Sequence, residues 1–166
     1  MASEACAMQF KEQCSVSFPL QGGKMEFKYT RNHHSVGDSM WHMEWCPKYR
    51  YNMFRKEEYK NLAGACIRKA AYENNIKIIE LYVMPDHMHC FVKLPLTMTP
   101  SKALQLLKGR SAFLFFRNHE RARLRYPQGH LWSRGKFVSS VGFVQLDVVK
   151  SYVRNQDEHH SGNSTL

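Results

Sequence analysis

The sequence lacks several features that would assign it quickly to a class. It has five cysteines but no C-x-x-C pair, so neither a disulfide framework nor a cysteine zinc site is indicated. No apolar run approaches the roughly 18 residues that span a bilayer. The segment 1–24 lacks the basic-then-apolar order of a signal peptide, and no internal repeat is visible. We therefore expect a reduced, cytoplasmic protein with no membrane segment.

Acidic residues are also scarce. The chain has 14 acidic and 24 basic residues, a formal net charge of +10, and a pI of about 9.5. This excess favours a polyanionic partner, either nucleic acid or an anionic membrane surface, over an ordinary basic protein. With 43% apolar residues, the chain can build a core without disulfides or structural metals. We predict that the polyanion is nucleic acid.

Hydrophobic periodicity predicts alternating strands and helices. We expect a flexible extension at 1–24, one domain at 25–160 and a disordered tail at 161–166, with at most one short strand before Gly37. Strands are predicted at 39–46, 76–84, 87–94 and 137–141, and helices at 56–74, 99–118 and 147–159. This order predicts an α+β fold, with a ferredoxin-like or RRM-like central antiparallel sheet and helices packed mainly on one face.

Two histidines, His87 and His89, follow the turn-like pair Pro85-Asp86. Residues two apart in a strand point to the same face, so the two imidazoles are expected to lie side by side while Met88 faces the core. Two adjacent imidazoles form half of a metal site. Because the chain has nine histidines, such a pair also arises by chance.

Tyr152 and Gln156 lie four residues apart in the last predicted helix and therefore share a face. The spacing suits a nucleophile beside a metal ligand. A tyrosine hydroxyl has a pKa near 10 and needs electrostatic help, which a divalent cation can supply. From the spacing alone, a Tyr152 packed in the core and a solvated Gln156 remain the alternative.

Basic residues gather at three places. The loop around Tyr49 combines them with aromatic residues, and a solvated loop with a packed tyrosine is the alternative there. The segment 131–136 is also mixed aromatic and basic, and the segment 102–125 holds seven basic residues and one acid. A one-signed surface favours contact with phosphates. The residues expected to bind nucleic acid on this basis are Lys48, Arg50, Lys108, Arg110, Trp132, Arg134 and Lys136.

Five runs of the chain carry a family resemblance. The runs 45–50, 82–89, 107–111, 130–138 and 152–156 resemble, in order and spacing, the single-tyrosine HUH transposases (TnpA type) of small insertion sequences. The resemblance extends over about residues 25–159.

The resemblance implies a mechanism. His87, His89 and Gln156 would bind Mg²⁺ or Mn²⁺, and Tyr152, on a C-terminal helix, would be the catalytic nucleophile. The tyrosine would attack single-stranded DNA carrying hairpins and form a 5′-phosphotyrosine link. It also implies a homodimer with composite active sites, in which the tyrosine helix docks in cis or in trans.

Other functions are compatible with the same residues. One is a domesticated HUH nuclease or a replication or conjugation nicking enzyme. Another is a non-catalytic nucleic-acid-binding domain that uses only its basic and aromatic residues. A metal-dependent covalent DNA adduct would exclude the last.

Overall fold

The computed structural model describes residues 30–32, 35–142 and 151. Its centre is a sheet of four strands in the order β4-β5-β3-β6, with every neighbouring pair antiparallel. The strands are β3 (Ser39–Trp45), β4 (Lys77–Val83), β5 (Met88–Leu94) and β6 (Phe137–Ser140). Each half of this β-α-β-β-α-β arrangement contributes one central and one edge strand, which confirms the predicted ferredoxin-like class.

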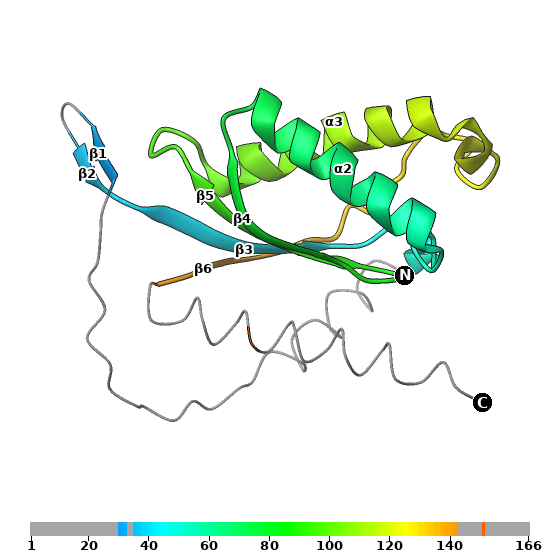
Figure 1. The fold of residues 1–166 in the computed structure, drawn as a ribbon, viewed down its shortest axis with the longest axis horizontal. Helices are drawn as coiled ribbons and strands as arrows, with labels where there is room; N and C mark the ends of the chain where they lie inside the picture. The colour runs from blue at the N-terminus through cyan, green and yellow to red at the C-terminus, as the bar shows by residue number, and fades with distance from the viewer. Residues whose placement is uncertain (1–29, 33–34, 143–150, 152–166) are drawn as a thin grey trace.

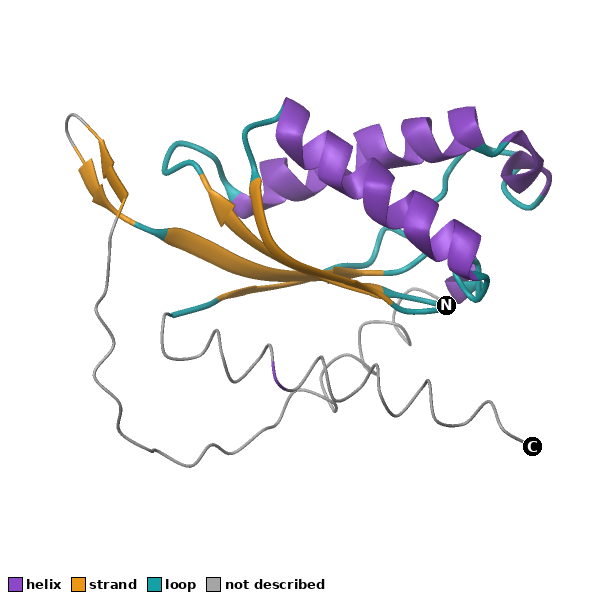
Figure 2. Cartoon of the chain, in the orientation of Figure 1, coloured by secondary structure: helices purple, strands orange, loops and turns teal. Residues whose placement is uncertain are grey.

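Two helices, α2 (Glu57–Glu73) and α3 (Pro100–Asn118), cover one face of the sheet (Figures 1 and 2). The helix α2 buries Ile67 and Ala70, as its three- and four-residue spacing predicts. The helix α3 begins as predicted, because the hydroxyl of Thr99 accepts from the Lys102 N–H at 3.3 Å and Pro100 occupies the first turn. Two short 3₁₀ turns, η1 (Lys48–Arg50) and η2 (Glu120–Leu124), follow β3 and α3.

Both faces of the central strands are buried. On the helix side, the main core includes Met43 of β3 and Met88, Cys90 and Val92 of β5, which confirms the predicted inward face of β5. The opposite face carries a smaller apolar cluster, formed by Met40, Met84, Phe91 and Val141. On this second face, His42, Glu44 and His89 are buried as well.

Two local predictions were wrong. The strands β1 (Thr30–Asn32) and β2 (Ser35–Gly37) pair as a hairpin where at most one strand was expected, because three-residue strands are too short to show alternation. The strand β5 begins at Met88, so His87 lies in the preceding turn, which the Met84 N–H closes by donating to the His87 carbonyl at 2.8 Å.

Several predictions fall outside the described residues. Ser151 is described and helical, but Tyr152 and Gln156 are not described. The predicted extension 1–24 and tail 161–166 are outside too, so these domain boundaries stay predictions. Within the described part of the chain, no helix combines the length and apolar character needed to cross a membrane.

Candidate metal centre

A polar cluster lies on the sheet face opposite the helices, where β3 and β5 are neighbours. The strand register pairs Glu44 with His89, and directly opposed residues of antiparallel strands project to the same face. His42 shares that face because it lies two residues from Glu44. The exposed fractions of His42, Glu44 and His89 are 9%, 7% and 5%. Two imidazoles and one carboxyl group are thus buried together.

The potential ligand atoms of the three side chains lie close to one another. His42 Nε2 lies 3.1 Å from His89 Nδ1, and Glu44 Oε2 lies 3.7 Å from the same nitrogen. One potential ligand atom from each residue lies within 4.8 Å of the others. The His42 ring stacks on Phe91, with centroids 4.4 Å apart, and this stacking fixes its plane. Imidazole and carboxylate donors in such proximity can bind a divalent cation.

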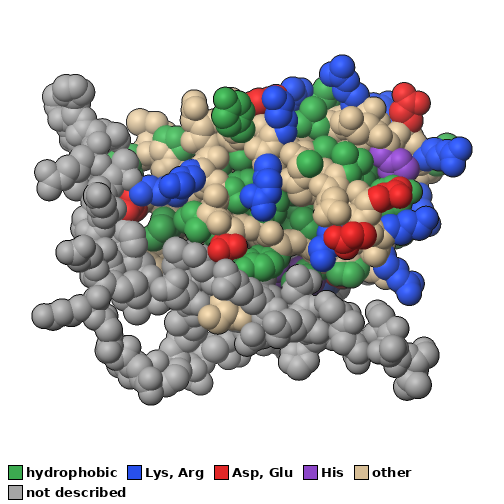
Figure 3. All heavy atoms as spheres, in the orientation of Figure 1, with side chains coloured by type: hydrophobic (Ala, Val, Ile, Leu, Met, Phe, Trp, Pro, Cys, Tyr) green, Lys and Arg blue, Asp and Glu red, His purple; other side chains and the backbone are tan. Residues whose placement is uncertain are grey.

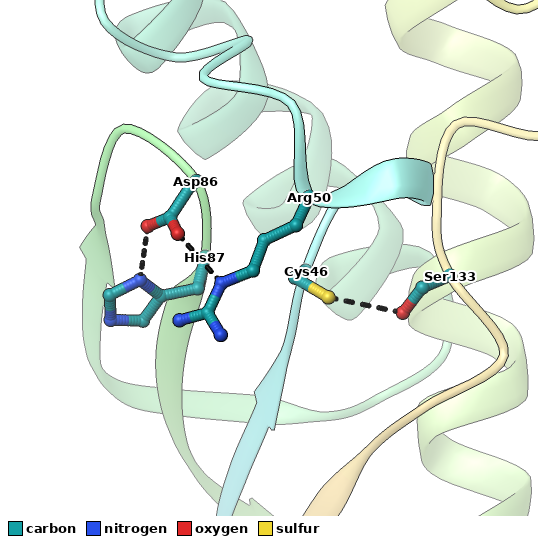
Figure 4. Close-up of polar contacts among 5 residues, drawn as sticks. All are labelled: Cys46, Arg50, Asp86, His87 and Ser133. Carbon is teal, nitrogen blue, oxygen red and sulfur yellow. Dashed lines mark hydrogen bonds and ion pairs between the residues drawn. The ribbon is translucent and has the colours of Figure 1, made fainter. Parts of the chain in front are cut away.

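His87 is held beside this cluster by a carboxylate of its own (Figure 4). Its Nδ1 lies 2.7 Å from Asp86 Oδ1, and Asp86 Oδ2 accepts from Arg50 Nε at 2.7 Å. The rings of His87 and His89 are 5.1 Å apart, which confirms their predicted proximity, and their planes differ by 82°. Because Asp86 occupies Nδ1 of His87, the Nε2 atom of His87 is the ring nitrogen left for a ligand.

The Arg50–Asp86 contact also stabilises an unfavourable turn. Tyr49 and Arg50 have φ angles of 63° and 52°, in the left-handed region that non-glycine residues rarely occupy. Each costs roughly 1–2 kcal/mol relative to a right-handed conformation. The ion pair ties this turn, at the exit of β3, to the turn that presents His87.

Burial keeps His42 and His89 neutral at pH 7. Burial lowers the pKa of His42 to about 4. Burial, followed by the charges of His42 and His87, lowers the pKa of His89 to about 3. Burial raises the pKa of Glu44, against the opposing charges of His87 and Arg50. Neutral imidazoles have a lone pair to offer, so the cluster is in the right protonation state to bind a cation at neutral pH.

One ring nitrogen is conspicuous in this arrangement. His89 Nε2 is buried and has no hydrogen-bond partner among the described residues. A buried polar atom left unpaired costs free energy, and a bound cation would satisfy it. The side chains of His87 and His89 therefore fit the divalent metal that the sequence resemblance implies. The third predicted ligand, Gln156, lies outside the described residues.

Sequence reasoning missed His42 and Glu44. The alternation of 39–46 already placed both on one strand face, but nothing in one strand identifies its neighbour. One sequence signal could have found them. A strand that buries two histidines needs polar side chains on the strand beside it, and the segment 39–46 offers His42 and Glu44 on one face.

Four of the residues predicted to contact DNA form hydrogen bonds or ion pairs with other residues of the protein. Arg50 binds Asp86, as described above, and Lys48 Nζ donates to Gln128 Oε1 at 2.9 Å. Arg110 donates to both carboxylate oxygens of Glu73, at 2.6 and 3.1 Å. Lys108 Nζ donates to the carbonyl of Ser133 at 2.6 Å, and burial lowers its pKa to about 8.

The segment 131–136 packs against the exit of β3. The Ser133 N–H donates to the Cys46 carbonyl at 2.9 Å, and the Cys46 thiol lies 3.2 Å from the Ser133 hydroxyl (Figure 4). Trp132 is 8% exposed, and its Nε1 donates to the Ser111 hydroxyl at 3.0 Å. Arg134 and Lys136 are exposed. The DNA-binding role of all seven residues stays a prediction.

Basic side chains also gather at the end of the molecule where η2 lies (Figure 3). A cavity of about 320 Å³ there is lined in part by Arg55, Lys56, Arg121 and Arg125. Arg121 and Arg125 belong to the predicted basic segment 102–125, and neither His87 nor His89 lines this cavity.

Comparison with known proteins places the chain in a family. The sequence profile described as "Transposase IS200 like" matches residues 35–156. The transposase for insertion sequence element IS200 of Salmonella typhimurium is 27% identical over 125 residues, covering 75% of this chain and 81% of the relative. The ISDra2 transposase TnpA of Deinococcus radiodurans is 29% identical over 122 residues, covering 71% and 84%.

A solved structure supports the fold. The crystal structure of a protein from Deinococcus radiodurans R1, described as a candidate transposase, superposes with a TM-score of 0.62 at 24% identity. It covers 76% of this chain and 97% of that protein.

The family match over most of the chain thus identifies a DNA-processing enzyme built on a ferredoxin-like sheet. The chain belongs to the IS200-like transposase family, as the profile match over 35–156 shows.

Proposed function

We propose that this protein cleaves and rejoins single-stranded DNA at the ends of an insertion sequence, through a 5′-phosphotyrosine intermediate on Tyr152. The observation that supports the proposal most strongly is the pair of histidines, each with a carboxylate near Nδ1, in a chain of this family. His87, His89 and Gln156 are the proposed metal ligands. The substrate is single-stranded DNA that carries hairpins.

The cleavage step exchanges one ester for another. The hydroxyl oxygen of Tyr152 gives up its proton and attacks the scissile phosphorus, the bond from phosphorus to O3′ breaks, and the departing O3′ takes up a proton. When bound, Mg²⁺ or Mn²⁺ polarises the phosphate and neutralises charge that develops in the transition state. Asp86 holds the His87 ring in place during this step through the 2.7 Å contact at Nδ1.

The joining step reverses the exchange on a different strand. A 3′-hydroxyl of a second DNA end attacks the phosphotyrosine, a phosphodiester forms, and the tyrosine hydroxyl is released. One phosphorus–oxygen bond forms for each that breaks, so the reaction requires no ATP and no hydrolysis.

The test is a strand-transfer assay with two labelled single-stranded oligonucleotides, each carrying a hairpin and an end sequence of the element. We expect a joined product with Mn²⁺ or Mg²⁺ and no ATP, and none with EDTA. A protein that binds both oligonucleotides but yields no joined or cleaved product, with or without metal, would be a non-catalytic binding domain. Cleavage without joining would instead favour a nicking enzyme.

The active site is proposed to be shared in a homodimer, and mixing variants tests this. If the tyrosine helix docks in trans, combining Tyr152→Phe with His89→Ala subunits restores one complete site per heterodimer. Neither variant alone is active in that case. If docking is in cis, the mixture stays as inactive as its components. Native mass spectrometry of the mixture, in which the two variant subunits differ in mass, checks that the heterodimers form.

A further inference from the structure

His89 contacts two different groups through one ring nitrogen. Its Nδ1 lies 3.1 Å from His42 Nε2 and 3.7 Å from Glu44 Oε2. Its Nε2 is buried and has no hydrogen-bond partner among the described residues. The proton of a neutral imidazole occupies one nitrogen or the other, so these contacts decide which nitrogen can bind a cation.

The contact between His42 and His89 allows two arrangements. In one, His42 Nε2 carries a proton and donates to His89 Nδ1, which places the proton of His89 on its unpaired Nε2. In the other, His89 Nδ1–H donates to His42 Nε2, and the His89 Nε2 lone pair is free. Two facing imidazoles do not by themselves favour either arrangement.

Glu44 breaks this equivalence. It is the cross-strand partner of His89 in the β3–β5 ladder, and its Oε2 lies 3.7 Å from Nδ1, so its carboxyl group is on the Nδ1 side of the ring. Glu44 and His89 are 7% and 5% exposed, and water therefore screens their interaction weakly. A carboxylate beside Nδ1 favours the proton on that nitrogen.

We propose that Glu44 is a positioning residue that keeps the proton of His89 on Nδ1, with His42 as its acceptor, so that Nε2 presents its lone pair to a divalent cation. The inference rests on the proposed function, because it takes His89 as a metal ligand. In this arrangement Glu44 and His42 contact the ligand His89 and do not bind the ion themselves.

The neighbouring histidine shows the same design. His87 also has a carboxylate at Nδ1, where Asp86 lies at 2.7 Å (Figure 4). Asp86 comes from the turn before β5, whereas Glu44 comes from the neighbouring strand β3. Both histidines of the pair are thus set to bind through Nε2, and carboxylates behind metal-binding histidines commonly orient the ring and fix its tautomer.

The first test measures the tautomer directly in the full chain without metal. Long-range ¹⁵N–¹H NMR of protein labelled with ¹⁵N-histidine distinguishes a proton on Nδ1 from one on Nε2. We expect the Nδ1–H form of His89 in the wild type and the Nε2–H form, or a mixture, in Glu44→Val. Glu120→Gln removes an exposed carboxylate elsewhere and should leave the signals of His89 unchanged.

The second test measures Mn²⁺ binding by electron paramagnetic resonance. We expect Glu44→Gln to bind Mn²⁺ about 10- to 100-fold more weakly, the size of effect typical of such outer residues, and Glu44→Asp to recover part of the loss. Circular dichroism confirms that each variant is folded. A Glu44→Val protein that has lost its fold is replaced by Glu44→Gln in the NMR experiment.

The outcomes are separable. A proton on Nε2 of His89 in the wild type overturns the inference, and so does a tautomer that Glu44 variants leave unchanged. A large loss of Mn²⁺ affinity without a change of tautomer would make Glu44 a direct ligand and also overturn the positioning role. Failure of the wild type to bind Mn²⁺ would refute the metal site of the proposed function, while the tautomer experiment still judges the role of Glu44.

Discussion

Arg50 and Asp86, 36 residues apart in sequence, form a 2.7 Å ion pair that joins the exit of β3 to the turn before β5. Asp86 uses its second oxygen to contact His87, so one carboxylate connects a strained turn to a proposed metal ligand. The positions of Arg50 and His87 are therefore coupled, and changing either partner of Asp86 is expected to disturb the other.

This contact should make stability depend on acid pH. Burial acts to raise the pKa of Asp86, but hydrogen bonds from His87 and Arg50 prevail and lower it to about 2. A lowered pKa means that stability is fully present above the unfolded value near 3.8 and is lost as pH falls toward 2. We expect Asp86→Asn to lower the free energy of unfolding by about 2 kcal/mol at pH 7.

Urea denaturation at pH 7 and at pH 2.5 measures this difference. The deficit of Asp86→Asn should shrink at the lower pH, because the wild-type carboxyl group is then partly protonated. Glu120→Gln, which removes an exposed carboxylate, serves as the control. An equal deficit at both pH values would show that the contact does not depend on the charge of Asp86.

Metal binding should stabilise the fold. A ligand that binds only the folded state at 100 times its dissociation constant adds about 2.7 kcal/mol to the free energy of unfolding. For a chain of this size, that raises the melting temperature by several degrees. We expect Mn²⁺ to produce this rise in the wild type and in His130→Gln, whose histidine is exposed and outside the centre, but not in His89→Gln. Equal rises in all three proteins would place the metal elsewhere.

Lys108 and Arg134 were both predicted DNA contacts, and the structure suggests different roles for them. Lys108 Nζ is half-buried and donates to the Ser133 carbonyl, whereas Arg134 is exposed. We expect Lys108→Met to destabilise the fold by about 1–3 kcal/mol, the usual cost of a lost charged hydrogen bond. Arg134→Ala should leave stability unchanged, weaken DNA binding and reduce its salt dependence.

Thermal unfolding and fluorescence anisotropy with labelled hairpin DNA, at two salt concentrations, separate these effects. Should Lys108→Met retain full stability yet lose DNA affinity, the structural role assigned to Lys108 would be incorrect. If Arg134→Ala binds as tightly as the wild type at both salt concentrations, Arg134 does not contact the phosphates.

The sequence predicted best those elements whose hydrophobic period repeats several times within one segment. The strand β3 and the helices α2 and α3 each repeat their hydrophobic period several times, and the cap at Thr99 marks one boundary within a residue. The hairpin of β1 and β2 was missed because three residues cannot display a period.

The centre was predicted only in part, for a different reason. His87 and His89 are close in sequence, so their spacing identified them. His42 and Glu44 join them through the register between β3 and β5, which no single segment specifies. Charge alone likewise did not distinguish Arg110, which pairs with Glu73 across two helices, from a cation available to DNA.

The central claim is that Tyr152 becomes covalently attached to DNA, and a denaturing gel measures this directly. Single-stranded hairpin DNA labelled at its 3′ end is incubated with Mn²⁺, because a 5′-phosphotyrosine link retains the 3′ part of the cleaved strand. We predict a labelled adduct with the wild type and with Tyr72→Phe, whose tyrosine is 80% exposed on α2, and none with Tyr152→Phe, although all three bind the DNA. An adduct of normal yield with Tyr152→Phe would contradict the account.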